Sequence, residues 1–235
     1  MQNNKEIKVL SKMTKSRFNL RKVASGVACL AVCMMLVGCG GRSSPNDIIT
    51  MTTNKSGNVK IYLSGNPEVV IDWGDGTTQS ETLPLLSDNS NFGGEFEHSY
   101  SNTTPRTITI TGSTLFCLQC DDNQLMSIDV SRCPVLMSLV CRKNQLTNLD
   151  VSKNPVLRKI DCSINQLTGL DVSKNPVLEK VNCSINQFTE DALRSFIESW
   201  NIRNESAQIS FIGNPGSTDE IINEIKSRGF QIFIE

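Results

Sequence analysis

The chain has 235 residues, of which 38% are hydrophobic and 20% are charged, so it is long enough for one or two domains with a substantial core. Its formal charge is −1, but residues 1–38 hold seven basic residues and one acidic residue. Without them, 16 Lys and Arg stand against 23 Asp and Glu, a formal charge of −7, which argues against nucleic acid as a partner.

The N-terminus has the pattern of a bacterial export signal. Basic residues precede an apolar run over 23–37, which is too short to be a comfortable permanent membrane span. The run leads into Leu36-Val37-Gly38-Cys39, which resembles the lipobox of bacterial lipoproteins. That resemblance implies a lipoprotein signal peptide over 1–38 and lipidation of Cys39, which anchors the chain to a membrane. The alternative is an uncleaved membrane anchor.

The start of translation and the side of the membrane are left open. The long basic leader is compatible with a start at Met1 or at Met13. Residues 39–47 are rich in Gly, Ser and Pro and predict a flexible tether. Gly40, rather than aspartate, follows the lipobox cysteine, which resembles the pattern for transfer to the outer membrane. We therefore expect an exported, membrane-anchored protein at the outer membrane or cell surface, facing inward or outward.

Residues 48–113 predict a small β-sandwich. Apolar runs over 59–63, 69–73 and 107–110 indicate strands that Gly, Asn and Ser turns separate. The run Ile71-Asp72-Trp73-Gly74-Asp75-Gly76-Thr77, with His98-Ser99-Tyr100 downstream, resembles the PKD family of immunoglobulin-like domains. In such a domain we expect a tight turn at Asp75-Gly76, Trp73 in the core and Tyr100 packed near the last strand. The segment is short for a complete sandwich, so one interpretation is a truncated domain that caps the first repeat of the C-terminal half.

Two sharper hypotheses concern the same segment. The carboxylates of Asp72 and Asp75 are groups that calcium prefers as ligands. No third carboxylate lies close in sequence, so a role in shaping the turn is favoured. His98, the only histidine, is a candidate base for Cys117, although no third orienting residue is visible. We expect no metal, no cofactor and no catalytic residue.

A cycle of 21 residues runs four times through 115–188. Its first two copies read L-x-x-L-x-C-x-x-N-Q-L, where positions 4 and 6 point inward from a short strand and position 5 points outward. Stacked copies predict a parallel sheet. The return side is expected to consist of turns, because the return path is short and contains a proline, so an ordinary helix does not fit there. The cycle resembles the internalin-like leucine-rich repeat family. This resemblance implies a curved right-handed solenoid over 114–188 whose concave face binds macromolecules and carries no catalytic residue.

Two residue types recur once per cycle and predict structural ladders. Asparagine turns the chain after each strand, and its amide is expected to bond the backbone of a neighbouring coil. Cysteine at position 6 is expected to be a reduced, buried filler, since bridging in-register positions strains a disulfide. The ladders comprise Cys120, Cys141, Cys162, Cys183, Asn123, Asn144, Asn165 and Asn186. A bridge between Cys117 and Cys133 is open but not favoured.

Residues 189–235 depart from the cycle and predict a capping repeat. Apolar residues at helical spacing indicate a helix over 189–200 that lies against the last coil. A fifth strand and its asparagine follow at Ile209, Phe211 and Asn214. Ser217 and Glu220 predict a capping box for a second helix that Gly229 ends. This cap closes the sheet edge, and we expect a monomer.

The predicted fold is mainly β: a short leucine-rich-repeat solenoid with a parallel sheet, between a small immunoglobulin-like (PKD-like) β-sandwich and an α/β cap. Function is expected on the concave face of the solenoid. The candidate ligand-binding residues are Gln119, Asp121, Asp122, Val140, Arg142, Lys143, Lys159, Asp161, Ser163, Lys180, Asn182 and Ser184. An ordinary solvated sheet is the competing interpretation, since these positions lack the aromatic anchors of protein interfaces.

These patterns support three functional hypotheses. The leading one is a non-enzymatic cell-surface lipoprotein that binds a protein or glycan, as in adhesion or host interaction, and it depends on family analogy. The second is an envelope or periplasmic organising protein without an extracellular ligand. The third, which is disfavoured, is a thiol-dependent enzyme, and it would need an accessible cysteine with a low pKa.

Overall fold

The computed structural model describes residues 46–83, 93–200 and 207–234. The predicted signal peptide, the lipidation site Cys39 and nearly all of the tether lie outside these residues. The described chain is mainly β, and its helices α3 (Glu190–Ser199) and α4 (Asp219–Ser227) both belong to the C-terminal region. Within the described ranges, no helix has the length and apolar character needed to cross a membrane.

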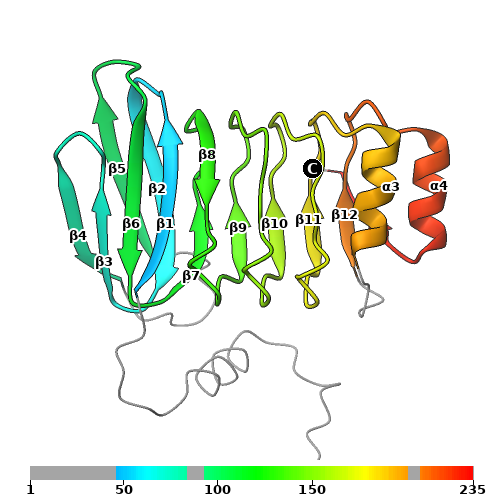
Figure 1. The fold of residues 1–235 in the computed structure, drawn as a ribbon, viewed down its shortest axis with the longest axis horizontal. Helices are drawn as coiled ribbons and strands as arrows, with labels where there is room; N and C mark the ends of the chain where they lie inside the picture. The colour runs from blue at the N-terminus through cyan, green and yellow to red at the C-terminus, as the bar shows by residue number, and fades with distance from the viewer. Residues whose placement is uncertain (1–45, 84–92, 201–206, 235) are drawn as a thin grey trace, which may run out of the picture. The chain divides into compact units, whose positions relative to one another are not determined.

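One sheet has the strand order β4-β3-β6-β1-β8, and all its neighbouring strands are antiparallel (Figure 1). Along β1 the side chains alternate, so that Ile49 and Met51 are buried while Thr50 and Thr52 are half-buried. The strands of this sheet are β1 (Asp47–Thr53), β3 (Glu68–Asp72), β4 (Thr78–Thr82), β6 (Arg106–Gly112) and β8 (Leu125–Asp129).

The second sheet has the order β13-β12-β11-β10-β9-β7-β2-β5. From β7 to β13 its neighbours are parallel, as the repeat predicts, whereas β2 is antiparallel to both β7 and β5. Its strands are β2 (Gly57–Gly65), β5 (Gly94–Tyr100), β7 (Leu115–Gln119), β9 (Ser138–Val140), β10 (Lys159–Asp161), β11 (Lys180–Asn182), β12 (Gln208–Ser210) and β13 (Gln231–Ile232).

Both sheets continue across the boundary between the predicted sandwich and the predicted solenoid. Strands β7 and β8 belong to the first repeat, yet β7 pairs with β2, and β8 pairs with β1. The buried apolar residues form one continuous core that includes Ile49 near the start of the described chain and Phe230 near its end. The N-terminal strands therefore cover the first coil of the solenoid. Their PKD-like character stays a prediction.

The inward side chains of the repeats are buried as the alternation predicts, whereas the position 5 residues Val140, Asp161 and Asn182, which were predicted to face outward, are only 5–7% exposed. The position 4 residues Leu118, Leu139, Ile160 and Val181 and the position 6 residues Cys120, Cys141, Cys162 and Cys183 are all 0% exposed. The thiols of Cys120, Cys162 and Cys183 donate to carbonyl oxygens of the next strand over 3.5–3.6 Å. All six described cysteines are free thiols, so the cysteine ladder fills space and forms no cross-links.

The asparagine of each coil binds backbone groups of two coils. The Asn144 amide donates to the carbonyl oxygens of Cys120 and Cys141 over 3.0 and 2.9 Å, and its Oδ1 accepts from the Asn123 and Leu125 amides over 3.0 and 2.9 Å. Asn123 has no preceding coil and instead bonds both backbone groups of Lys60 on β2. The ladder thus joins the N-terminal strands to the solenoid.

A second asparagine ladder lies on the return side of the coils. The Asn154 amide donates to the carbonyl oxygens of Val130 and Cys133 over 2.9 and 2.8 Å, and the Asn175 amide donates in the same way to Val151 and Asn154 of the coil before it. Cys133 occupies this position in the first coil, where the neighbour is strand β1, and its thiol donates to the Ile48 carbonyl over 3.6 Å. Cys133 is therefore not bridged to Cys117.

The return path differs between the first coil and the later ones. The later coils return through turns, as predicted, but the first returns through strand β8. This departure from the prediction has a simple cause, because β1 lies beside the first coil and offers backbone partners for a ladder, with Met51 aligned on Ile128. In the described ranges, no strand pairs with the return side of a later coil.

Helix α3 lies against the preceding coil, as predicted. Its N-cap is Thr189, whose hydroxyl accepts from the Ala192 amide over 3.3 Å. At the other end, the Trp200 indole donates to the Leu178 carbonyl over 3.3 Å, and the Ser199 hydroxyl accepts from the backbone of the coil. These bonds fix the helix on the return side of the last repeats.

The predicted capping box of α4 is wrong by one residue. The N-cap is Thr218, whose hydroxyl accepts from the Ile221 amide over 3.4 Å. Ser217 instead donates its hydroxyl hydrogen to the Phe211 carbonyl over 2.8 Å, because the asparagine turn before it leaves that carbonyl within reach. Gly229 follows the helix with φ of +88°, as expected for the residue that ends it.

Candidate functional site

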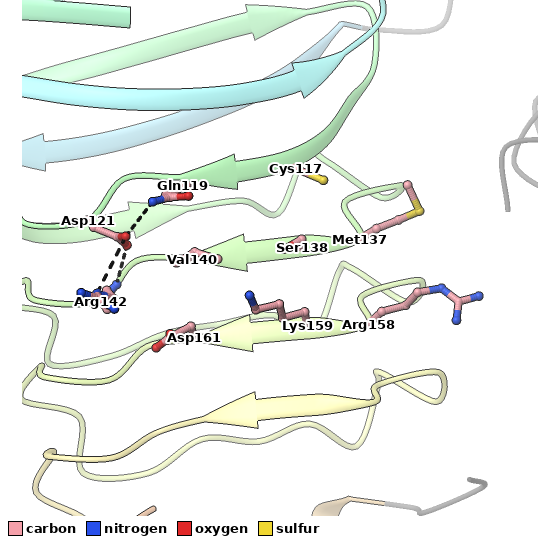
Figure 2. A pocket seen from close by; sticks show the side chains of 10 residues that line it. All are labelled: Cys117, Gln119, Asp121, Met137, Ser138, Val140, Arg142, Arg158, Lys159 and Asp161. Carbon is pink, nitrogen blue, oxygen red and sulfur yellow. Dashed lines mark hydrogen bonds and ion pairs between the residues drawn. The ribbon is translucent and has the colours of Figure 1, made fainter. Parts of the chain in front are cut away.

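The sheet face that the family resemblance implies to be concave, called the concave face below, carries a shallow hollow of about 430 Å³ over β7, β9 and β10. Strand alternation builds it, because outward side chains of neighbouring parallel strands stand in rows across the sheet. Figure 2 shows these side chains projecting from the three strands and the bends at their ends. The lining residues are Cys117, Gln119, Asp121, Met137, Ser138, Val140, Arg142, Arg158, Lys159 and Asp161.

Asp121 and Arg142 form the polar corner of the hollow (Figure 2). The Asp121 carboxylate accepts from the Gln119 side-chain amide over 2.9 Å and from the Arg142 backbone amide over 3.2 Å. The Arg142 guanidinium lies 4.0 Å from the same carboxylate. Burial raises the pKa of Asp121, and the neighbouring Arg142 charge opposes that rise. The side chain of Arg142 is about half exposed.

Asp161 and Lys159 stand on the same strand but differ in their surroundings. Asp161 is only 5% exposed, and its carboxylate accepts from the amide and hydroxyl of Ser163 over 3.1 and 2.7 Å. Lys159 is exposed and lies in register with Ser138 on one side and Lys180 on the other. Asp161 is therefore held in place by its own coil, whereas Lys159 presents its charge to the hollow.

Cys117 is the thiol of the hollow, and its electrostatics do not suit a nucleophile. Burial raises the pKa of Cys117 to about 11, although the Lys159 charge acts in the opposite direction. Burial likewise raises the pKa of Cys133 to about 12. Since the thiolate is the reactive form, both thiols stay protonated near neutral pH.

His98, which was considered as a base for Cys117 but not favoured, makes its contacts in the N-terminal strands. Its Nε2 lies 2.7 Å from the Asp75 carboxylate, and its ring stacks on Trp73 with centroids 5.0 Å apart. Tyr100 completes this cluster, with its hydroxyl donating to the Trp73 carbonyl over 2.5 Å. His98 therefore orders the turn around Asp75, in keeping with its structural interpretation.

The two aspartates considered for calcium shape their turn. The Asp72 carboxylate accepts from the Gly74 amide over 2.9 Å, and the Asp75 carboxylate accepts from the Thr77 amide and hydroxyl over 3.1 and 2.6 Å. The pKa of Asp75 is lowered to about 2, mainly by the hydrogen bond from the Thr77 hydroxyl. In the described part of the chain, no three His, Cys, Asp or Glu residues gather as a metal site would require.

The hollow contains some of the predicted ligand-binding residues and not others. It brings together Gln119, Asp121, Val140, Arg142, Lys159 and Asp161. Farther along the sheet and outside the hollow are Ser163, Lys180, Asn182 and Ser184. Asp122 and Lys143 also lie outside it, in the bend after each strand, with φ of 54° and 55°. Ile164 and Ile185 share this left-handed conformation, which β-branched residues rarely adopt.

Four lining residues, Cys117, Met137, Ser138 and Arg158, were not among the predicted candidates. Cys117 and Ser138 occupy position 3 of the cycle, whereas Met137 and Arg158 occupy position 2, which strict alternation would turn inward. The strands begin one residue later, so position 2 lies in a bend where alternation does not apply. The sequence signal available was the change of residue type at position 2, from Phe116 through Met137 and Arg158 to Glu179.

Comparisons with known proteins give limited similarity. No protein-family model matches the chain, and no curated protein matches it. Among solved structures, the chain is similar to one described as the functional domain of InlJ from Listeria monocytogenes, which includes a cysteine ladder; the identity is 28% and the TM-score 0.31. The match covers 48% of this chain and 33% of that one, so the chain spans about a third of the length of that structure.

Proposed function

We propose that the chain is a non-enzymatic binding module whose concave sheet face holds a protein or glycan ligand. The observation that carries this proposal is the hollow, in which Lys159 on β10 and Arg142 just after β9 are exposed on coils that the asparagine ladder fixes. Exposed charges of this kind contribute little to stability, since a surface ion pair is worth about 0–1 kcal/mol. Polar groups held on a rigid backbone instead reduce the entropy lost on binding.

The electrostatics of the hollow argue against a thiol-dependent catalytic role. A thiol-dependent enzyme needs a thiolate, and the pKa of Cys117 is raised to about 11. The His98 imidazole is held by Asp75 and Trp73. A binding role requires only that the exposed side chains face a partner.

Array binding tests this function, with charge reversals on opposite sides of the coils. The full chain is applied to arrays of purified glycans and proteins, together with the double variant Arg142→Glu, Lys159→Glu. The matched control, Lys153→Glu with Lys174→Glu, makes the same charge change at exposed turns of the return side. We expect the concave variant to lose at least tenfold in affinity, about 1.4 kcal/mol, and the control to bind like the native chain. Equal binding by both variants would refute a concave site.

We further propose that the module acts as a lipoprotein anchored through Cys39 at the outer membrane or cell surface. The lipobox-like sequence and the short apolar run before it support this location. Two or three acyl chains would hold the chain permanently on a membrane, and the tether over 39–47 would leave the concave face free to meet a partner.

A further inference from the structure

The face that holds the hollow does not end at the solenoid. In the pairing of β2 with β7, Tyr62 is aligned with Gln119, and Leu63 with Leu118. Aligned residues of neighbouring strands point to the same side of a sheet, and Leu63 and Leu118 are both buried in the core. Tyr62 therefore projects from the concave face, beside the hollow. The predicted face lacked an aromatic residue, and strand β2 supplies one.

Strand β5 extends the same face by one more row of side chains. Glu95 is aligned with Tyr62, and the Tyr62 hydroxyl donates to its carboxylate over 3.2 Å. Lys60, the next outward residue of β2, lies 3.4 Å from Glu95 and 3.3 Å from Glu97. The side chains of all three charged residues are more than 40% exposed.

Charge is distributed unequally along this extended face. Glu95 and Glu97 flank the single lysine of β2 and form an acidic end, while Asp121 is ion-paired with Arg142 in the hollow. Three cationic residues, Arg142, Lys159 and Lys180, stand on β9, β10 and β11 or directly after them and form a basic end. The carboxylate of Asp161 is poorly accessible to a ligand at the basic end, because Asp161 is only 5% exposed and is hydrogen-bonded to Ser163.

We propose that this face binds an extended polypeptide segment of a partner protein, with a basic side chain at the acidic end, an acidic side chain at the basic end, and Tyr62 as the aromatic anchor between them. The inference depends on the proposed function and adds the ligand class and the N-terminal strands. Tyr62 belongs to the residue types that dominate protein interfaces. Opposite charges at the two ends disfavour a uniformly anionic glycan or membrane surface, which Glu95 and Glu97 would repel.

Strand spacing sets the length of the segment. Neighbouring strands lie about 4.8 Å apart, so three spacings from β2 to β10 place Tyr62 roughly 14 Å from Lys159, and four spacings from β5 give roughly 19 Å. An extended peptide advances about 3.3 Å per residue. The basic side chain of the partner should therefore be about six residues from its acidic side chain, and the residue that meets Tyr62 about four residues from the acidic one.

Selection from a library of displayed random dodecapeptides tests the inference. Peptides selected on the full chain are synthesised with a fluorescent label, and their affinities are measured by anisotropy for the native chain and for Tyr62→Ala, Tyr62→Phe, Lys159→Glu and Lys153→Glu. We expect selected peptides to carry Lys or Arg about six residues from Asp or Glu. Their affinity should fall at least tenfold with Tyr62→Ala and Lys159→Glu, and change little with Tyr62→Phe and Lys153→Glu.

The remaining outcomes separate this inference from the proposed function. Peptides that lose affinity with Lys159→Glu but not with Tyr62→Ala would overturn the inference and leave the concave site standing. Binding on the glycan array without any selected peptide would also overturn the polypeptide ligand alone. Peptides indifferent to both variants, or an absence of any binder, would overturn both. Near-ultraviolet circular dichroism of each variant verifies that the fold is intact.

Discussion

The side-chain amide of Asn165 donates to the carbonyl oxygen of Cys141, one coil earlier, over 3.0 Å. The same amide also bonds the Cys162 and Ser163 carbonyls of its own coil, while its Oδ1 accepts from the Leu146 amide over 3.0 Å. One buried side chain thus satisfies backbone groups that the bend after each strand leaves without a strand partner. The concave side chains keep their positions because these bends are fixed.

We predict that Asn165→Ala destabilises the chain by about 3 kcal/mol. The substitution removes several buried hydrogen bonds worth about 1 kcal/mol each and leaves the Leu146 amide without its acceptor. Urea unfolding followed by circular dichroism measures the loss. Asn58→Ala is the matched control, since Asn58 is exposed and its side chain bonds another exposed side chain, and it should change stability by less than about 0.5 kcal/mol. A similar effect of both substitutions would contradict the role of the ladder.

We predict that the N-terminal strands and the solenoid unfold in one transition, because both sheets and the core cross their boundary. The chain carries two tryptophans, Trp73 near the N-terminal end of the core and Trp200 near its C-terminal end. In Trp73→Phe the fluorescence reports the C-terminal cap, and in Trp200→Phe it reports the N-terminal strands. For each variant, fluorescence and far-ultraviolet circular dichroism should give the same urea midpoint. Midpoints that differ within one variant would indicate separable domains.

Sequence periodicity was sufficient for the solenoid because the same residue pattern is repeated in every coil. Burial at position 6, as in Cys141, follows from strand alternation alone, and the asparagine turn follows from residue chemistry. Alternation also placed Lys159 and Arg142 on one face. The hollow also includes residues outside the strands, where alternation does not apply, so Arg158 was missed.

The joining of the two regions could not be derived from the sequence. Alternation says which residues of β2 face outward, but not that Tyr62 is aligned with Gln119, because no repeat relates those two strands. That β8 is a strand could not be predicted for the same reason, since it depends on pairing with β1. Long-range pairing of this kind is decided by the tertiary fold, which overrides local propensity.

We predict that Cys117 resists alkylation in the native protein. With a pKa of about 11, roughly one thiol in a thousand is ionised at pH 8, against about a quarter for an ordinary cysteine. Iodoacetamide labelling mapped by mass spectrometry should be at least about a hundredfold slower than for a small free thiol, and should accelerate about tenfold per pH unit from pH 8 to 10. Lys159→Met should slow it further, because the lysine charge lowers the pKa of Cys117. Rapid labelling near pH 7 would revive the thiol-enzyme hypothesis.

We predict that Asp75 contributes stability that is lost in acid. Its pKa is about 2 in the folded chain against an ordinary value of 3.8, so the contribution is complete above about pH 4 and disappears as the pH falls toward 2. Because the side chain is partly exposed and screened, we expect Asp75→Asn to cost only about 1 kcal/mol at pH 6 and to flatten the dependence of stability between pH 4 and 2.

Urea midpoints across this pH range measure that effect. Asp72→Asn is the control. Like Asp75, Asp72 accepts a hydrogen bond from the backbone of the turn, but it is the Asp75 carboxylate that contacts His98. This control should leave the acid dependence largely intact. An unchanged dependence in Asp75→Asn would show that other carboxylates govern the acid response.

Protease shaving of intact cells tests the central claim most directly, namely that an exported lipoprotein presents the concave face to a partner outside the cell. Protease is added to intact cells, and blotting follows the solenoid together with a periplasmic protein as the lysis control. The account predicts loss of the solenoid with the control intact. Protection of the solenoid under conditions that digest known surface proteins would contradict it and point to a role inside the envelope.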